Sequence, residues 1–295
     1  MNSFCDSLEI GLGQYCPASR WPHVLARGGI QNGAPEREAE TMLTRNPIKR
    51  LIAEGRFAAT TGLSFYSPDL VEILAQTGVD GISVDAEHGA LSEGEIVDMT
   101  RVAELYGLPM TCRVPSLRSD FILRVLDGGV TNIVVPHVTD AAMAARAVQA
   151  VRFPPVGRRG LGNFTRATGN GRLKAAEYVT LANAEIMLIV QIEDRAGLDN
   201  VEAIAATDGV DAIFIGANDL ALDLGYPGGA DQPEVQAAID RIITVSKAAG
   251  RAIQVVSSTG DAEGWIARGA QILALGWQSA VTGGFARDIK RIKNA

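Results

Sequence analysis

The chain from residue 57 onward alternates between apolar runs of strand length and segments with helical periodicity. The eight runs are Phe57–Gly62, Gly81–Asp85, Met110–Val114, Asn132–Val138, Ile186–Glu193, Ala212–Gly216, Ala252–Ser257 and Ile272–Trp277. Continuous apolar strands are typical of parallel sheets that are buried on both faces. Eight such units favour a (β/α)₈ TIM barrel over an open doubly wound sheet.

The segments between these runs carry apolar residues at helical spacing. Clear examples are residues 92–107, 140–151, 197–206, 233–250 and 261–269, several of which end in the glycine that is common at helix C-termini. Residues 43–55, LTRNPIKRLIAEG, predict a first amphipathic helix before the barrel.

Residues 1–41 differ from the rest, because they are rich in glycine, proline and polar residues and show no sustained period. They predict a flexible or loosely docked N-terminal extension, followed by the barrel over residues 42–295. Met42 precedes the first predicted helix, so one hypothesis is that it is the native start. A mass of the natural protein that includes Met1 or Asn2 would contradict that hypothesis.

The composition narrows the class of protein. The net charge of −7 argues against a nucleic-acid-binding surface and against anionic membranes. No apolar run is long enough for a transmembrane helix. Three cysteines, an odd number, argue against a disulfide framework and favour a reducing cytoplasm.

A barrel places its active site at the carboxyl ends of the strands. The polar and ionisable residues that follow or end the apolar runs are Glu87, His88, Arg113, His137, Glu193, Asn218 and Asp219. Because they come from different strands, they should gather at one face, as catalytic residues do.

Glu193 and Asp219 follow what should be neighbouring strands. Two carboxylates there would repel each other unless a cation lies between them, and Mg²⁺ or Mn²⁺ is the natural occupant. The alternative is that each carboxylate caps the helix that follows it. Spacing alone leaves the two interpretations about even, and Asp194 is the better candidate for a cap.

His88 and Arg113 are further candidates for chemistry. A neutral imidazole at a strand end can act as a general base if a carboxylate orients it, and Asp85, Glu87 and Asp127 are available. A histidine that bonds a loop carbonyl is the plainer alternative. The planar donors of Arg113 suit a carboxylate or an enolate. They would equally suit a structural ion pair with Asp85 or Glu87.

Two loops could bind or steer an anion. Gly216–Ala221, GANDLA, places small residues at a strand-to-helix turn, where free backbone N–H groups attract anions. Residues 151–169 form a basic loop with Arg158, Arg159 and Arg166. This loop predicts either a lid that steers an anionic substrate or a subunit contact.

The chain from about residue 46 onward resembles the HpcH/HpaI aldolase family of metal-dependent class II pyruvate aldolases. The matching motifs occur in order and are VDAEHG (84–89), CRVP (112–115), VLDGGVTNIVVPHV (125–138), VRFPPVGRRGLG (151–162), VQIEDRAGLDNVEAIAATDGVD (190–211) and IFIGANDLA (213–221).

The resemblance implies roles for the matching residues. It implies a divalent ion (Mg²⁺, Mn²⁺ or Co²⁺) on Glu193 and Asp219, His88 as general base with Asp127 as its partner, and Arg113 on the enolate. It implies that Gln191 lines the site and that the turn formed by Gly216, Ala217, Asn218 and Asp219 binds the pyruvate carboxylate. It also implies a homohexamer, or a trimer, with C-terminal helices exchanged between subunits.

The sequence departs from the family pattern at several positions. Ala217 replaces a usual proline, Ala221 a frequent serine, and His137 a usual apolar residue. The late segment LGWQSAVTGG replaces a Gly-Ser-Asp segment. The departures bear on the pocket for the second substrate, so His137 is expected to contact substrate.

The predicted reaction makes or cleaves the C3–C4 bond of a 4-hydroxy-2-oxo acid, giving pyruvate or hydroxypyruvate and an aldehyde through a metal-stabilised enolate. Two alternatives stay open. A lyase of the citrate lyase or malyl-CoA type would use a CoA thioester on the same barrel, and a binding barrel would have no catalysis.

Overall fold

The structure is a computed structural model that describes residues 46–258 and 260–294. The predicted extension over residues 1–41, the hypothesis on Met42, and His23, Cys5 and Cys16 lie outside the described residues. The fold and the site below concern the described part of the chain.

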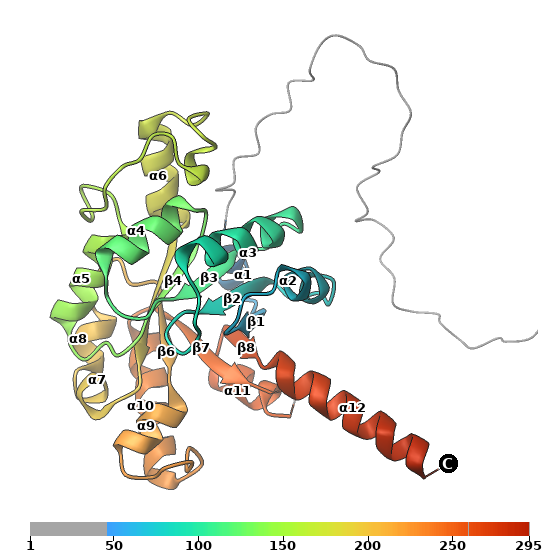
Figure 1. Cartoon of the computed structure of the whole chain (residues 1–295). Coiled ribbons are helices and arrows are strands. Elements are labelled where there is room, and N and C mark those ends of the chain that lie inside the picture. Colours follow the sequence, from blue (N-terminus) through green and yellow to red (C-terminus); the bar gives the residue numbers. More distant parts are fainter. Residues whose placement is uncertain (1–45, 259, 295) are drawn as a thin grey trace, which may run out of the picture. The chain divides into compact units, whose positions relative to one another are not determined.

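Eight parallel strands close into a barrel in sequence order, with β8 hydrogen-bonded to β1 (Figure 1). The strands are β1 (Ala58–Leu63), β2 (Gly81–Asp85), β3 (Met110–Arg113), β4 (Asn132–Val135), β5 (Met187–Ile192), β6 (Ala212–Ile215), β7 (Ala252–Ser257) and β8 (Ile272–Leu275). The predicted (β/α)₈ TIM barrel is therefore confirmed.

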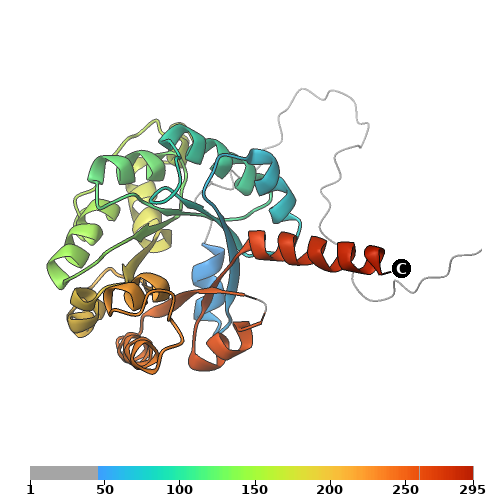
Figure 2. The ribbon, with the colours of Figure 1, turned by 60° about the horizontal axis from the view of Figure 1, so that its bottom comes forward.

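Helices surround the strands, as the view in Figure 2 shows. Those that follow β1 to β4 are α2 (Pro68–Ala75), α3 (Glu93–Leu105), α4 (Ser119–Asp127) and α5 (Ala141–Val151), and α6 (Ala175–Glu185) precedes β5. The later ones are α7 (Arg195–Asp199), α8 (Val201–Ala205), α9 (Ala217–Asp223), α10 (Pro233–Ala248), α11 (Ala262–Arg268) and α12 (Trp277–Lys293). The single helix predicted over residues 197–206 falls within α7 and α8.

Alternation along the strands divides their side chains between two apolar clusters. On β5, Leu188, Val190 and Ile192 pack outward with the helices, whereas Met187 and Ile189 belong to the inner cluster. Side chains on a strand alternate between faces, so Gln191 continues the inner set.

Helix α1 (Pro47–Ala53) packs against the inner cluster. Asn46 caps it by accepting from the Ile48 N–H, and Ile48 and Leu51 are buried among Val134, Met187 and other inner residues. Helix α1 precedes β1, and so it covers the amino ends of the strands.

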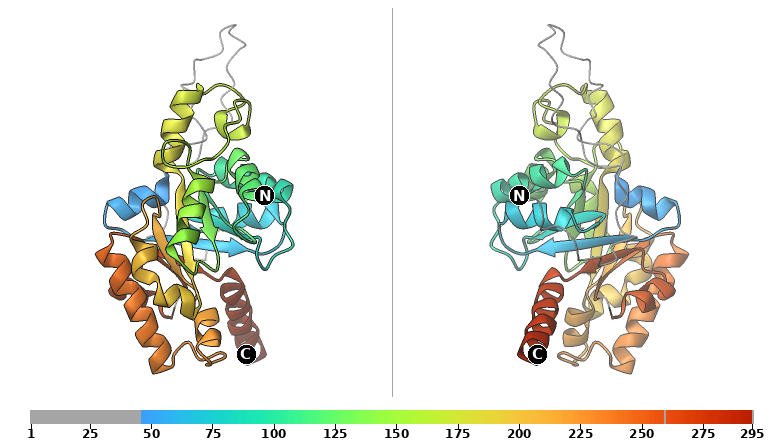
Figure 3. Two further views of the ribbon diagram at one scale, coloured as in Figure 1. Left: turned by 90° about the vertical axis from the view of Figure 1, so that its left-hand side faces the viewer. Right: turned by 90° about the vertical axis from the view of Figure 1, so that its right-hand side faces the viewer.

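The other end of the molecule carries α12, which has no buried residue. In Figure 3, α6 and the loop before it lie on one side of the barrel, and α12 lies toward the opposite side. Among residues 46–258 and 260–294, no helix combines the length and apolar character needed to cross a bilayer.

Candidate active site

Arg113 lies at the end of β3 and makes a two-pronged ion pair with Asp85 at the end of β2. Its Nε donates to Asp85 Oδ1 at 2.9 Å, and its Nη2 donates to Asp85 Oδ2 at 2.5 Å. Nη1 lies 3.5 Å from Gln191 Oε1 and 3.2 Å from Glu87 Oε2. The predicted ion pair with Asp85 or Glu87 is therefore present, and it fixes the plane of the guanidinium.

Gln191 and Glu193 extend this network across the mouth of the barrel. Gln191 Nε2 donates to Glu193 Oε2 through a short hydrogen bond, and both side chains are buried. Period-two alternation places Glu193 on the same inward face as Gln191. A buried carboxylate is thus held at the carboxyl end of β5.

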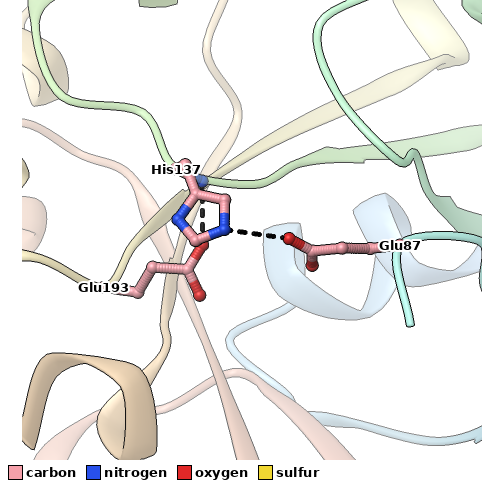
Figure 4. Close-up of side chains that lie close together, drawn as sticks. All are labelled: Glu87, His137 and Glu193. Carbon is pink, nitrogen blue, oxygen red and sulfur yellow. Dashed lines mark hydrogen bonds and ion pairs between the residues drawn. The ribbon is translucent and has the colours of Figure 1, made fainter. Parts of the chain in front are cut away.

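His137 lies between Glu193 and Glu87 (Figure 4). Its Nδ1 is 3.2 Å from Glu193 Oε1, and its Nε2 is 3.0 Å from Glu87 Oε1. The backbone N–H of His137 also donates to Glu193 Oε1 at 2.8 Å. One ligand atom from each of the three side chains lies within 4.8 Å of the others.

Negative charge dominates this end of the barrel. Burial raises the pKa of the Glu193 carboxyl above its ordinary value, and the charges of Glu87 and Asp219 act in the same direction. Burial alone would lower the pKa of Arg113, but Asp85, Glu87 and Glu193 raise it overall. Four carboxylates therefore face one permanently charged guanidinium.

The donor set fits a divalent cation. Glu87 Oε2 is buried and accepts no hydrogen bond from the described residues, although Arg113 Nη1 forms an ion pair with it at 3.2 Å, and only 9% of the Glu87 side chain is exposed. A carboxylate buried in this way is costly unless a cation or a donor reaches it. Carboxylate oxygens with an imidazole nitrogen suit Mg²⁺, Mn²⁺ or a similar ion.

Asp219 lies in the first turn of α9 and is half-buried. It is close enough to Glu193 to raise the pKa of that carboxyl, but it lies outside the tight group of Glu87, His137 and Glu193. Gly216, not Asp219, occupies the N-cap position of α9. Asp194 caps α7 as expected, because its side chain accepts from the Gly197 N–H at 2.7 Å. The helix-cap alternative therefore applies to neither Glu193 nor Asp219.

The turn from β6 into α9 packs directly beneath Glu193. A Cβ on Gly216 would lie 2.5 Å from Glu193 Cβ and 2.9 Å from Gln191 Nε2. Ala217 and Asn218 follow in the first turn, and Asn218 is exposed. The glycine thus lets the backbone approach the buried carboxylate closely.

His88 lies on the loop after β2 and is exposed. Its backbone N–H points to Asp85 Oδ1 at 3.4 Å, and its Nε2 lies 3.6 Å from Glu87 Oε2. The structure thus brings His88 to the edge of the network, with Glu87 as the nearest carboxylate.

Asp127, the predicted partner of His88, has a different partner in this chain. It is the last residue of α4, and its Oδ1 accepts from Arg159 Nη2 at 2.8 Å. Helices of such a barrel run back toward the amino ends of the strands, whereas His88 follows a carboxyl end. Asp127 and His88 therefore lie at opposite ends of one subunit.

Of the three arginines of the basic loop, Arg159 is buried and Arg166 is partly buried, whereas Arg158 is exposed. Arg159 is buried against the rings of Phe153 and Tyr178, and Arg166 pairs with Glu104. These contacts fix the loop to α4, α3 and α6 and do not suit a mobile lid.

The sequence interpretation did not identify the group formed by Glu87, His137 and Glu193. Glu87 was expected among the polar residues at the strand ends, and the role considered for it was that of a partner to His88 or Arg113. The usable signal is its spacing, because Glu87 follows Asp85 by two residues and so continues the inward face of β2.

Comparisons with known proteins point to a single family. Residues 63–282 match the HpcH/HpaI aldolase/citrate lyase family. A hydroxypyruvate/pyruvate aldolase of Chromohalobacter salexigens is 38% identical over 242 residues, which span 79% of this chain and 92% of that protein. A 2-keto-3-deoxy-L-rhamnonate aldolase of Klebsiella pneumoniae is 35% identical over 79% of this chain and 88% of its own length.

A solved HpcH/HpaI aldolase from Desulfitobacterium hafniense has the same fold. It superposes with a TM-score of 0.78 at 29% identity and covers 84% of this chain and 96% of its own. The match over residues 63–282 includes the ends of β2 to β6, from which the buried acidic network is built. The chain belongs to the HpcH/HpaI aldolase/citrate lyase family.

Proposed function

We propose that the protein is a divalent-metal-dependent aldolase. It cleaves the C3–C4 bond of a 4-hydroxy-2-oxo acid to give pyruvate or hydroxypyruvate and an aldehyde, or forms the same bond in the reverse direction. The observation that carries the proposal is the buried Glu193 carboxylate, which shares a network with Arg113 at the mouth of a family barrel. Relatives named as hydroxypyruvate/pyruvate and 2-keto-3-deoxy-L-rhamnonate aldolases support it.

Glu193 and Asp219 are the proposed protein ligands of the cation. Mg²⁺, Mn²⁺ or Co²⁺ on these carboxylates supplies Lewis acidity toward the 2-oxo oxygen of the substrate. The site holds more carboxylates than guanidinium groups, so the charge of a bound cation would offset the excess negative charge.

The residues of the chain supply orientation and proton transfer. Arg113, fixed by Asp85, directs an N–H toward negative charge that develops on the 2-oxo oxygen. Gln191 holds Glu193 from the other side. The turn formed by Gly216, Ala217, Asn218 and Asp219 is the proposed site for the substrate carboxylate.

Cleavage begins with removal of the proton on the 4-hydroxyl. The electron pair of the C3–C4 bond then passes to the 2-oxo acid fragment, the aldehyde departs, and the resulting enolate takes a proton at C3. His88 is the proposed base, and its exposed imidazole at the rim can exchange protons with water.

Asp127 can orient His88 only across a subunit boundary, because the two residues lie at opposite ends of one barrel. We therefore assign the pairing to an oligomer, a hexamer or a trimer, in which Asp127 of one copy meets His88 of another. Exposed apolar residues on α12 are consistent with assembly.

Complementation tests this assignment. His88→Ala and Asp127→Ala should each lose most activity. In oligomers assembled from both variants, roughly one site in four should combine an intact His88 with an intact Asp127 and so regain activity. Asp120→Ala, on the same helix as Asp127 but exposed, serves as the control. A mixture that assembles yet stays inactive rules the shared site out.

The reaction itself is tested by exchange of the C3 protons of pyruvate in D₂O, followed by NMR. The chelated protein should show no exchange, and Mg²⁺, Mn²⁺ or Co²⁺ should restore it. A panel of aldehydes then identifies the acceptor. Full exchange in the presence of EDTA, together with borohydride trapping of an adduct, would contradict the mechanism. Turnover of acyl-CoA substrates in place of 2-oxo acids would favour the citrate-lyase alternative.

The proposed partners are small molecules and further copies of this chain. The acidic charge gives no basis for a nucleic-acid partner. A reducing cytoplasm is the proposed compartment, in keeping with the buried free thiol of Cys112.

A further inference from the structure

We propose that His137 is itself a ligand of the divalent cation, through Nδ1, and that Glu87 positions its ring by accepting a hydrogen bond from Nε2–H. The inference rests on the proposed function and deepens it, because it concerns which metal the same site prefers. It gives the site a nitrogen ligand in addition to its carboxylates.

The distances at His137 suit this assignment. Ligand atoms on neighbouring positions of an octahedral ion lie about 3 Å apart, because each is about 2.1 Å from the metal. Nδ1 of His137 and Oε1 of Glu193 are 3.2 Å apart. These two atoms can therefore bind one ion with little movement of either side chain.

The position of the single proton on a neutral imidazole also points to Nδ1 as the ligand atom. A neutral imidazole has one N–H and one lone pair, yet both ring nitrogens face carboxylate oxygens. If Nε2–H donates to Glu87 at 3.0 Å, the lone pair of Nδ1 faces Glu193 Oε1. A cation between those two atoms replaces their repulsion with two coordinate bonds.

The backbone at His137 is held in an unusual conformation that serves the contact. Its φ is 53°, in the left-handed region that residues other than glycine seldom adopt. In this conformation the backbone N–H reaches Glu193 Oε1 while the ring stands beside the same oxygen. Two contacts with one carboxylate offset the strain.

Glu87 supplies an independent observation. Its side chain is more than nine-tenths buried, its Oε1 faces His137 Nε2 at 3.0 Å, and its Oε2 is paired with Arg113, so the carboxylate is held in place to accept from the imidazole. A carboxylate that accepts from the second nitrogen of a ligating histidine fixes the tautomer and orients the ring. Glu87 is thus a positioning residue rather than a metal ligand.

The consequence is a changed metal preference. Mg²⁺ favours sites made of oxygen ligands, whereas imidazole suits later transition metals such as Co²⁺ and Ni²⁺. We therefore expect this protein to favour Co²⁺ over Mg²⁺ more strongly than a site with carboxylates and water alone.

Binding measurements on the chelator-stripped full chain test the preference. His137→Asn is the informative variant, since asparagine tolerates a left-handed backbone and offers at most an oxygen. Its affinity for Co²⁺ should fall at least about tenfold, while that for Mg²⁺ changes by less than about threefold. Glu87→Ala should weaken Co²⁺ binding about tenfold.

Electron spin-echo spectroscopy of the Mn²⁺-loaded protein tests the bond directly. A coupled imidazole nitrogen should be present in the wild type and in Glu87→Ala, and absent in His137→Asn. His88→Asn is the matched control, because His88 also lies beside Glu87 and should keep the coupling.

The outcomes separate this inference from the proposed function. A wild-type protein that binds Mn²⁺ without a coupled nitrogen overturns the ligand assignment and leaves the aldolase intact. Loss of the coupling in His88→Asn but not in His137→Asn also overturns it. A protein that binds no divalent cation and exchanges no pyruvate protons overturns both.

Discussion

Arg113 uses its donors for two purposes. Nε and Nη2 are committed to Asp85, whereas Nη1 remains directed toward Gln191 and Glu87. The ion pair is compatible with the proposed role of Arg113 toward the substrate, because the contact with Asp85 fixes the plane in which Nη1 lies. Lysine has the charge but cannot reproduce this fork.

We therefore predict that Arg113→Lys lowers kcat/KM about 100-fold, as expected when one oxyanion donor is lost. The matched control is Arg118→Lys, since Arg118 is exposed and pairs with Asp120 beyond the site. Steady-state kinetics of retro-aldol cleavage measures the effect. Equal kcat/KM values for the two variants would show that Arg113 takes no part in the reaction.

Asp85 gives the site a pH-dependent contribution to stability. Burial alone would raise the pKa of Asp85, but the Arg113 guanidinium and two backbone N–H groups lower it below its ordinary value. A lowered pKa means that the contribution is complete above the unfolded pKa of about 3.9 and is lost as the pH falls through the folded pKa.

The stability prediction compares wild type and Asp85→Asn in EDTA. The difference in their free energies of unfolding should be constant from neutral pH to about pH 5 and should shrink only below about pH 4. Urea denaturation at each pH measures it. A difference that vanishes well above pH 5 would show that Asp85 is not held by Arg113.

At the scale of the elements, β5 and the turn after β6 build the site together. The inner face of β5 passes from Met187 and Ile189 to Gln191 and then to Glu193, while Gly216 packs beneath the carboxylate. The apolar part of the strand fills the barrel and the polar part faces its mouth. The absence of a side chain at Gly216 makes room for Glu193.

Gly216→Ala should therefore displace the Glu193 carboxylate. The backbone at Gly216 has φ −83°, which alanine adopts readily, so the effect is steric. We expect metal affinity to fall about tenfold or more, with about 1–3 kcal/mol lost from overpacking. Gly264→Ala in α11, where a Cβ meets no atom within 4 Å, should bind metal normally. Calorimetric titration of both variants distinguishes these outcomes.

The elements were largely predictable from sequence, and parts of the site were not. Seven of the eight predicted apolar runs contain their strand, and the first stops one residue short of Leu63 at the end of β1, because a parallel strand buried on both faces is continuously apolar. The left-handed turn at His137 and its approach to Glu87 depend on tertiary packing between β2 and β4. Asp127 was a sound expectation from motif, but its place at the end of α4 becomes visible only in three dimensions.

At the scale of the whole molecule, α12 has no buried residue, and only its first residue, Trp277, is described in contact with the barrel, through Phe65. Its exposed apolar residues are Val281, Phe285, Ile289 and Ile292. At 3.6 residues per turn they fall on one face. Figures 1 and 2 draw this helix leading away from the barrel. The face is suited to packing against another copy, as the proposed exchange of C-terminal helices requires.

Phe285→Glu should therefore weaken the oligomer. Burying the charge in an apolar contact is unfavourable, so we expect the mass from light scattering to shift toward the monomer. Arg287→Glu places a new carboxylate on the opposite face of α12 and should leave the mass unchanged. An unaltered mass for both variants would indicate assembly through another surface.

The position of α1 has a kinetic consequence. With Ile48 and Leu51 packed against the inner cluster and apolar side chains filling the barrel, small molecules reach Glu193 only from the carboxyl ends of the strands. In the proposed cleavage, the 2-oxo acid fragment is the one that the cation at Glu193 would hold, so we expect the aldehyde to depart first. Pyruvate should then inhibit competitively against the cleaved substrate and the aldehyde noncompetitively. Access to the site from one side only would thereby fix the order in which the two products are released.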